Sequence, residues 1–238
     1  TGNVTINQLN EFSEITSIQA GNTASYTTPG SANQLQTFTG TNLILDVGTD
    51  YDDSLSAPGF VQVTADSVNL DVTASQVTAT ARVGDVNLTG TNSSIGVAAN
   101  SQNGDVTVAM NGNITHNAIS GDTVSVTANG GNITQGTGRV SGSSVSLTGN
   151  NVSAQTATSS LSVNVGSSGN ATIGNQSASL TANISTTGNV DVSNTGTLAG
   201  NYAANNLKLA GQSVNAGISA NTVEGDATGG NVALTSTG

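Results

Sequence analysis

Apolar and polar residues alternate in short runs along most of the chain. Runs such as 86–88, 106–108 and 190–192 place Val or Leu at every second position, with a polar residue between. This period of two predicts strands with one buried face, and no stretch shows the period of about 3.6 residues of an amphipathic helix. The pattern therefore predicts an all-β protein.

The alternating runs begin at a recurrent Gly-Asn or Gly-Asp pair. From Gly112 the pair returns at Gly131, Gly149, Gly169 and Gly188, at nearly equal intervals. A unit of this length cannot bury its apolar side alone, whereas stacked units bury it against their neighbours. The spacing predicts a right-handed parallel β-helix with about 19–20 residues per rung and about 4.8 Å between rungs.

The alternation also predicts which side chains point inward. The predicted inward set is Val86, Leu88, Val106, Val108, Ile114, Ile133, Val145, Leu147, Leu161, Val163, Val165, Ile173, Leu180, Ile184, Val190, Val192, Leu207, Leu209, Val232 and Leu234. Residues between them, such as Thr107, Thr134 and Asp191, should face outward.

The Gly-Asn pairs suit the turns between strands, because Gly and Asn tolerate turn backbone and an Asn side chain can bond nearby backbone. Stacked at one rung spacing, the asparagines of these pairs should form an amide ladder, each donating to its neighbour. The predicted ladder consists of Asn113, Asn132, Asn150, Asn170 and Asn189. Asp85 and Asp105 occupy the same position of the repeat, where two stacked carboxylates repel unless they are solvated or bridged.

The first sixty residues differ from the rest. They hold both prolines and five of the six aromatic residues, and clear repeats stop after Ile6 and resume near residue 61. We therefore expect residues 1–60 to form irregular rungs, a cap or a small β extension, and residues 61–238 to form the regular β-helix.

Composition and charge exclude several classes of protein. The chain has no Cys, only 7% charged residues and three basic residues against fourteen acidic ones, a net charge of -11. Without a cationic surface, nucleic acid and anionic membrane are not expected partners. No apolar run reaches the roughly 18–20 residues of a membrane helix, so direct membrane insertion is not expected either.

Units such as GDTVSVTANGGNIT (121–134) and GSSVSLTGNNVSA (142–154) resemble the β-helical shaft repeats of filamentous haemagglutinin-like adhesins exported by two-partner secretion. Autotransporter passengers are a weaker likeness. The resemblance covers roughly residues 61–238 and rests on repeat style. It implies a secreted, rod-shaped, calcium-tolerant protein of the cell surface or extracellular space of a Gram-negative bacterium.

The terminal sequences continue the same repeat. A Gly-Asn-Val triplet lies near each end of the chain, at Gly2-Asn3-Val4 and at Gly230-Asn231-Val232. We expect either end-to-end self-association or continuation of the repeat in a longer chain, with glycans or proteins of a host or neighbouring cell as further partners.

An acidic cluster is the strongest candidate for a metal site. Asp46, Asp50, Asp52 and Asp53 lie close together in the sequence, and closely spaced carboxylates suit calcium. The cluster matches neither the EF-hand loop nor the calcium β-roll repeat, so a solvated surface loop is the alternative.

The sequence offers little for catalysis, and we expect no enzyme. His116 is the single histidine and is interpreted as a solvated turn residue. The alternative function is a polysaccharide hydrolase that uses carboxylates on one line of turns, Asp85, Asp105 and Asp122. An ice-binding face would need a repeated Thr-x-Thr row, which the outward residues do not supply. The leading hypothesis is a structural segment of a surface adhesin or extracellular fibre, a rigid rod for display, adhesion or self-assembly.

Overall fold

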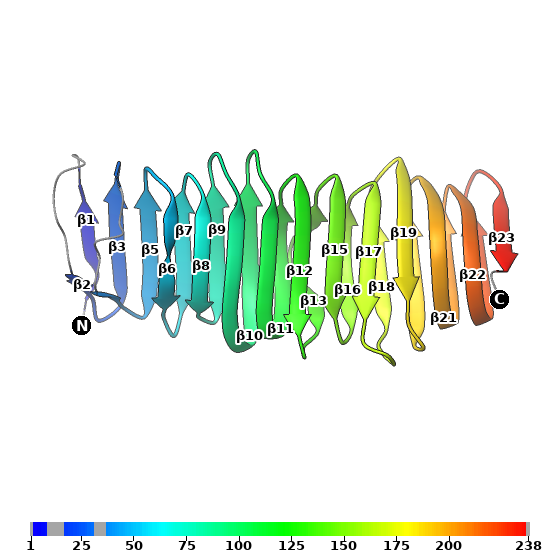
Figure 1. The fold of residues 1–238 in the computed structure, drawn as a ribbon, viewed down its shortest axis with the longest axis horizontal. Helices are drawn as coiled ribbons and strands as arrows, with labels where there is room; N and C mark the ends of the chain where they lie inside the picture. Colours follow the sequence, from blue (N-terminus) through cyan, green and yellow to red (C-terminus); the bar gives the residue numbers. More distant parts are fainter. Residues whose placement is uncertain (1, 9–16, 31–36, 237–238) are drawn as a thin grey trace.

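The computed structural model describes residues 2–8, 17–30 and 37–236. These residues form strands β1 to β23 and no helix, and consecutive turns stack along one axis into a rod (Figure 1). The protein is a parallel β-solenoid of about 12 turns with about 18 residues per turn. The predicted all-β parallel β-helix is confirmed, with a slightly shorter average turn than the repeat suggested.

Two long parallel ladders run along the rod. The first ladder contains β1 (Val4–Asn7), β3 (Thr23–Thr28), β5 (Asn42–Val47), β7 (Phe60–Ala65), β9 (Gln76–Ala81), β13 (Ile133–Gln135), β14 (Val140–Ser141), β16 (Val152–Ala157), β18 (Ala171–Asn175) and β20 (Asn189–Asn194). The second ladder contains β6 (Tyr51–Ser56), β8 (Val68–Thr73), β12 (Thr123–Asn129), β15 (Ser144–Gly149), β17 (Ser160–Val165), β19 (Ser179–Ser185) and β23 (Val232–Ser236).

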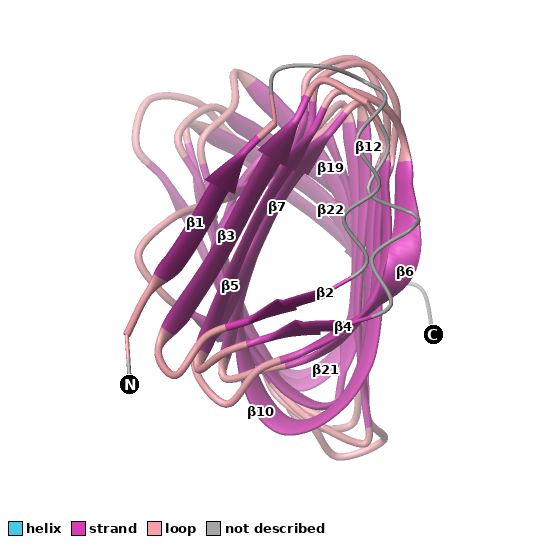
Figure 2. Ribbon diagram, turned by 90° about the vertical axis from the view of Figure 1, so that its left-hand side faces the viewer, coloured by secondary structure: helices cyan, strands magenta, loops and turns pink. Residues whose placement is uncertain are grey.

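Four long strands belong to both ladders because they continue through a corner of the turn. They are β10 (Val86–Ser101), β11 (Val106–Ser120), β21 (Thr197–Gly211) and β22 (Ser213–Ala227). Seen along the rod, β1, β3, β5 and β7 form one wall, and β6 and β12 lie on the opposite one (Figure 2). A separate two-stranded parallel sheet pairs β2 (Ser17–Gln19) with β4 (Thr37–Thr39) near the N-terminal end.

The rungs of the first ladder keep a constant spacing in the middle of the rod. Ile114, Ile133, Val152, Ala171 and Val190 lie side by side in succession, at the same sequence interval from each rung to the next. The second ladder varies more, since the step from β12 to β15 is longer than the step from β15 to β17. Turns of unequal length therefore compensate for one another, and the first ladder stays in register.

A glycine allows β11 to continue through its corner. Gly112 has a φ of 134°, and a Cβ at this position would lie 1.8 Å from the backbone oxygen of Asn92 in the preceding rung. Any other residue would collide with that backbone, so this corner requires glycine.

The core is a continuous apolar column inside the rod. Eighteen of the twenty predicted inward residues are buried, from Val86 to Leu209, and the predicted outward residues Thr107, Thr134 and Asp191 are exposed. The two exceptions are Val232 and Leu234 on β23, which remain 43% and 36% exposed. They lie on the last described strand, which pairs with β22 and with no further strand in the described part of the chain.

The N-terminal sixty residues contain strands that join the ladders. Strand β3 pairs with β1 and β5, and β5 pairs with β7 across the predicted boundary at residue 60. Residues 1, 9–16 and 31–36 lie outside the described residues. The division into residues 1–60 and 61–238 stays a prediction.

The inward and outward phase can be tested at two adjacent residues. Ile133 is buried and Thr134 is exposed. Ile133→Asp would bury an unpaired charge, and we expect it to reduce the free energy of unfolding by about 3–5 kcal/mol in urea titrations. Thr134→Asp should change it by less than about 0.5 kcal/mol. Equal losses at the two positions would contradict the assigned phase.

Candidate functional site

A ladder of asparagine side chains connects successive rungs at one corner. Each Asn Oδ1 accepts a hydrogen bond from the backbone N–H of the equivalent residue one rung later. The pairs are Asn113 with Asn132 (2.9 Å), Asn132 with Asn151 (3.1 Å), Asn151 with Asn170 (2.9 Å) and Asn170 with Asn189 (2.8 Å). These bonds satisfy turn N–H groups that the strands leave unpaired.

The predicted ladder was wrong in most of its bonds and at one residue. The Oδ1 atoms accept from backbone N–H groups, and among these residues one amide donates to its neighbour, Asn151 Nδ2 to Asn132 Oδ1 (2.9 Å). Asn151, not Asn150, occupies the ladder position, and Asn150 instead donates from Nδ2 to the backbone oxygen of Gly130 (2.9 Å). The reason is register, because each ladder residue directly precedes the inward residue of the aligned row that runs from Ile114 to Val190 in the first ladder. Asn151 precedes Val152, as Asn132 precedes Ile133.

Two aspartates make similar bonds at a different corner. Asp85 and Asp105 precede Val86 and Val106 of the second ladder, whereas Asn113 aligns with Ser94 of the preceding rung in the first ladder. The prediction that these aspartates share the position of the ladder asparagines was therefore wrong. Asp85 Oδ1 accepts from the backbone N–H of Asp105 (2.9 Å), and Asp105 Oδ1 accepts from the N–H of Thr123 (2.9 Å). Both carboxylates therefore bond turn backbone, as the asparagines do. Asp122, the third residue of the hydrolase alternative, accepts from Ser143 through its backbone oxygen (2.9 and 2.8 Å).

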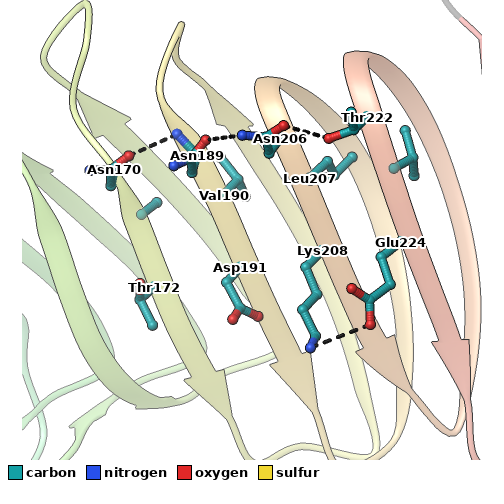
Figure 3. A pocket seen from close by; sticks show the side chains of 12 residues that line it. Asn170, Thr172, Asn189, Val190, Asp191, Asn206, Leu207, Lys208, Thr222 and Glu224 are labelled. Atoms are coloured by element: carbon teal, nitrogen blue, oxygen red, sulfur yellow. Dashed lines mark hydrogen bonds and ion pairs between the residues drawn. The ribbon is translucent and has the colours of Figure 1, made fainter.

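A groove lies on the outer face of the first ladder near its C-terminal end (Figure 3). It has a volume of about 540 Å³ and crosses β18, β20, β21 and β22. One wall, here called the amide row, consists of Asn170, Asn189, Asn206 and Thr222. The other wall, here called the charged row, consists of Thr172, Asp191, Lys208 and Glu224. The backbone of the residues between them, including Val190 and Leu207, forms the floor.

The amide row is held by hydrogen bonds along the rod. Asn206 Nδ2 donates to Asn189 Oδ1 (2.8 Å), and the Thr222 hydroxyl donates to Asn206 Oδ1. Each side chain thus fixes the orientation of its neighbour one rung away. The result is a preorganised line of amide groups facing solvent.

The charged row alternates in sign. Asp191, Lys208 and Glu224 are neighbours on three consecutive rungs, and Lys208 Nζ lies 3.4 Å from Glu224 Oε1. Both side chains of that pair are more than half exposed, so the ion pair contributes little to stability. The Asp191 carboxylate makes no hydrogen bond or ion pair with the described residues and faces solvent (Figure 3).

The structure disperses the residues predicted to bind calcium. Asp46 lies on β5 in the first ladder, whereas Asp52 and Asp53 lie on β6 in the second ladder and Asp50 directly precedes β6. Within residues 2–8, 17–30 and 37–236, no three His, Cys, Asp or Glu side chains gather closely enough to hold a metal ion. Asp50 instead borders a shallow depression of about 500 Å³ that Asp66 and Asp85 also line.

Each of the four carboxylates has a partner of its own. Asp50 accepts from the Ser67 hydroxyl (2.6 Å), Asp52 from Asn69 Nδ2 (2.8 Å) and Asp53 from the N–H of Ser54 (2.7 Å). Asp46 pairs with the guanidinium of Arg82, which also donates to the backbone oxygen of Val47 (2.6 Å) and lies 3.8 Å from Asp66. Arg82 thereby connects carboxylates from separate rungs.

His116 is a core residue, and its interpretation as a solvated turn residue was wrong. It lies within β11 between Val97 and Gln135 of the adjacent rungs, and its side chain is fully buried. The alternation of β11 after Ile114 places it inward. Its Nδ1–H donates to the backbone oxygen of Asn117 (3.1 Å), and its Nε2 is buried without a hydrogen-bond partner. Burial lowers the pKa of His116, and the Asn117 and Ser153 backbones offset part of this effect.

The sequence pattern also did not predict a buried polar network at another corner of the turn. Asn175 Oδ1 accepts from the Thr156 hydroxyl (2.7 Å), and its Nδ2 donates to Asn194 Oδ1 (2.8 Å). Asn194 in turn donates to the backbone oxygen of Thr197 (2.8 Å). The network satisfies polar groups inside the rod, so it is structural.

The calcium site stays a prediction with a direct test. If Asp50 and Asp52 share an ion, millimolar calcium should raise the melting temperature by ligand linkage. The double variant Asp50→Asn, Asp52→Asn should abolish that rise in calorimetry with and without calcium. If calcium leaves the melting temperature of the parent protein unchanged, the predicted calcium site is refuted.

Burial of neutral His116 predicts acid sensitivity. Its folded pKa lies below the ordinary value of 6.5, so the unfolded chain binds more protons below that pH. We expect the contribution of His116 to the free energy of unfolding to be constant above about pH 6.5 and to fall below it, by at most about 1.4 kcal/mol per pH unit.

Urea unfolding at pH 7.5 and 5.5 measures this effect. His116→Val, which copies Val97 of the preceding rung, should reduce the pH dependence. Thr115→Val, the adjacent control, should keep it. A parent protein as stable at pH 5.5 as at pH 7.5 would refute the assignment.

Comparison of the chain with protein-family models, curated proteins and solved structures finds no match. Among the residues that the structure describes, no helix is long and apolar enough to cross a membrane.

Proposed function

We propose that this chain is a rod-forming structural segment of a bacterial surface adhesin or extracellular fibre. The observation that carries the proposal is the stacking of about 12 turns along one axis, with ladders that continue from β1 to β23. Because each turn contacts mainly its neighbours, such a chain gains length with every repeat. Length and stiffness are the properties that a protein needs for display away from a cell.

The character of the outer surface supports the same proposal. Outward positions are mostly Asn, Thr and Ser, and charged residues make up only 7% of the chain. Hydroxyl and amide groups keep a long rod hydrated without strong charge repulsion between stacked rungs. Such a surface is compatible with contact with glycans or proteins of another cell.

The sequence repeats support the cellular location. Units such as residues 121–134 resemble the shaft of filamentous haemagglutinin-like adhesins, and the solenoid is the fold which that resemblance implied. We therefore propose that the protein is secreted and lies on the surface, or outside, of a Gram-negative cell. The proposal assigns no catalytic role to Asp85, Asp105 or Asp122, and the hydrolase alternative stays a prediction.

Immunogold electron microscopy tests the proposed location. Antibodies raised against the chain should label filaments on intact, unpermeabilised cells of the source organism. Brief protease treatment of intact cells should remove the label, while a cytoplasmic control protein stays intact. Labelling that appears only after permeabilisation would contradict the proposal.

Self-association is a separate part of the proposal. The exposed apolar side chains Val232 and Leu234 on β23 give one end of the described rod a surface that a further β rung would cover. We expect linear oligomers at high concentration in analytical ultracentrifugation. The pair Val232→Lys and Leu234→Lys should block them, whereas Thr172→Lys and Thr134→Lys on the outer flank should not. A parent protein that stays monomeric would refute this part.

A further inference from the structure

We propose that the groove between the amide row and the charged row binds an extended, uncharged oligosaccharide whose long axis follows the rod. This inference rests on the proposed function, because it assigns the proposed adhesin a ligand class and a binding site. Three properties of the groove support the inference: its polar groups, its direction along the rod and its net charge.

The groove walls fit a ligand rich in hydroxyl groups. Asp191 offers acceptors only, Lys208 offers donors only, and Asn189 and Asn206 offer amides whose orientation is already fixed. A hydroxyl both donates and accepts, so it can bond every one of these groups. The carboxylate of Asp191 is the strongest acceptor left open, since Glu224 already pairs with Lys208.

The direction of the groove favours a chain over a single sugar. Equivalent residues recur on successive rungs, with Asn189 and Asp191 on β20 followed by Asn206 and Lys208 on β21. Rungs are about 4.8 Å apart, a distance close to the repeat of an extended β-linked hexose chain. Consecutive sugar units can therefore meet equivalent asparagines of the amide row on consecutive rungs, with a charged group on the opposite wall.

The floor argues against a peptide ligand. The residues that form it, including Val190 and Leu207, lie in strands already paired in parallel with their neighbours. A peptide that binds as an added strand needs a free sheet edge. In the described part of the chain the groove has such an edge only at its β22 end, beside Thr222, Val223 and Glu224, and the rest of the groove lies on a sheet face.

The charge of the groove argues against an anionic chain. Asp191, Lys208 and Glu224 together carry one net negative charge at neutral pH, and Lys208 is paired with Glu224. An acidic polysaccharide would be repelled by Asp191 and would find no unpaired cation among the lining residues. An uncharged sugar chain avoids this repulsion.

Isothermal titration calorimetry of the whole chain with cellohexaose, chitohexaose and β-mannohexaose tests the proposal. We expect saturable binding of at least one of the three with a Kd below about 1 mM. Asp191→Ala and Asn206→Ala should each weaken it about tenfold, as the loss of one good hydrogen bond to a sugar predicts. Oligogalacturonate of the same length should bind more weakly.

The chain provides a matched control for Asn206. Asn201 lies on the same strand, β21, is exposed, and donates from Nδ2 to Asn183 Oδ1 of the preceding rung (3.3 Å), but it belongs to the second ladder. Asn201→Ala should leave the affinity unchanged. Thermal melting of each variant separates a lost contact from a lost fold.

Absence of saturable binding to all three sugars, or equal losses in Asn206→Ala and Asn201→Ala, would overturn the inference. Tighter binding of oligogalacturonate would also overturn it. None of these results bears on where the protein is located. Surface labelling without sugar binding would leave the proposed function standing, and labelling confined to permeabilised cells would remove it whatever the groove binds.

Discussion

The pairing of every rung with the rungs before and after it is the constraint on which the rest of the structure depends. Backbone N–H and C=O groups inside a sheet must find partners, and in this fold the partners lie in the adjacent turns. That requirement fixes the rung spacing and the parallel direction of the strands. It also places each side chain beside the equivalent side chain of the next turn. Side chains at one position of the repeat therefore form a row along the rod.

Stacking explains why the composition is so narrow. A charge repeated at every rung would repel its copies at about 4.8 Å, whereas amides and hydroxyls can bond their copies. The Asn113 ladder shows the favourable case, with each Oδ1 accepting from the next rung. Where charges do stack, they alternate in sign, as in Asp191, Lys208 and Glu224, or bond the backbone of the next rung, as Asp85 does.

Much of the fold could be predicted from sequence because the buried face follows a period of two. The alternation correctly predicts that Ile133 and its equivalents point inward. It does so only when the first inward residue of each run is identified correctly. The Gly-Asn pair indicates Asn150, whereas the residue directly before the inward Val152 is Asn151. A single histidine beside Asn117 suggests a solvated turn, although the spacing of two between Ile114 and His116 indicates burial.

The groove could not be predicted in the same way. Its walls join positions 170 to 224 across four strands, and the register steps there are unequal. The sequence intervals from Asp191 to Lys208 and from Lys208 to Glu224 are both shorter than the interval between Gly-Asn pairs. The Gly-Asn repeat therefore does not predict that these three residues are neighbours. A signal existed, because each follows an Asn-apolar or Thr-apolar pair at the same position of its unit.

Contacts restricted to neighbouring turns also determine how the rod responds to a pulling force. Tension applied at one end loads the terminal turn first, since its ladder bonds are held on one side by a single neighbour. A turn of about 18 residues, once detached, extends to roughly 60 Å at about 3.3–3.6 Å per residue. Under load the rod should lengthen in small steps of similar but unequal size as it unwinds turn by turn. A molecule built this way can absorb the pull between two surfaces without losing all of its structure at once.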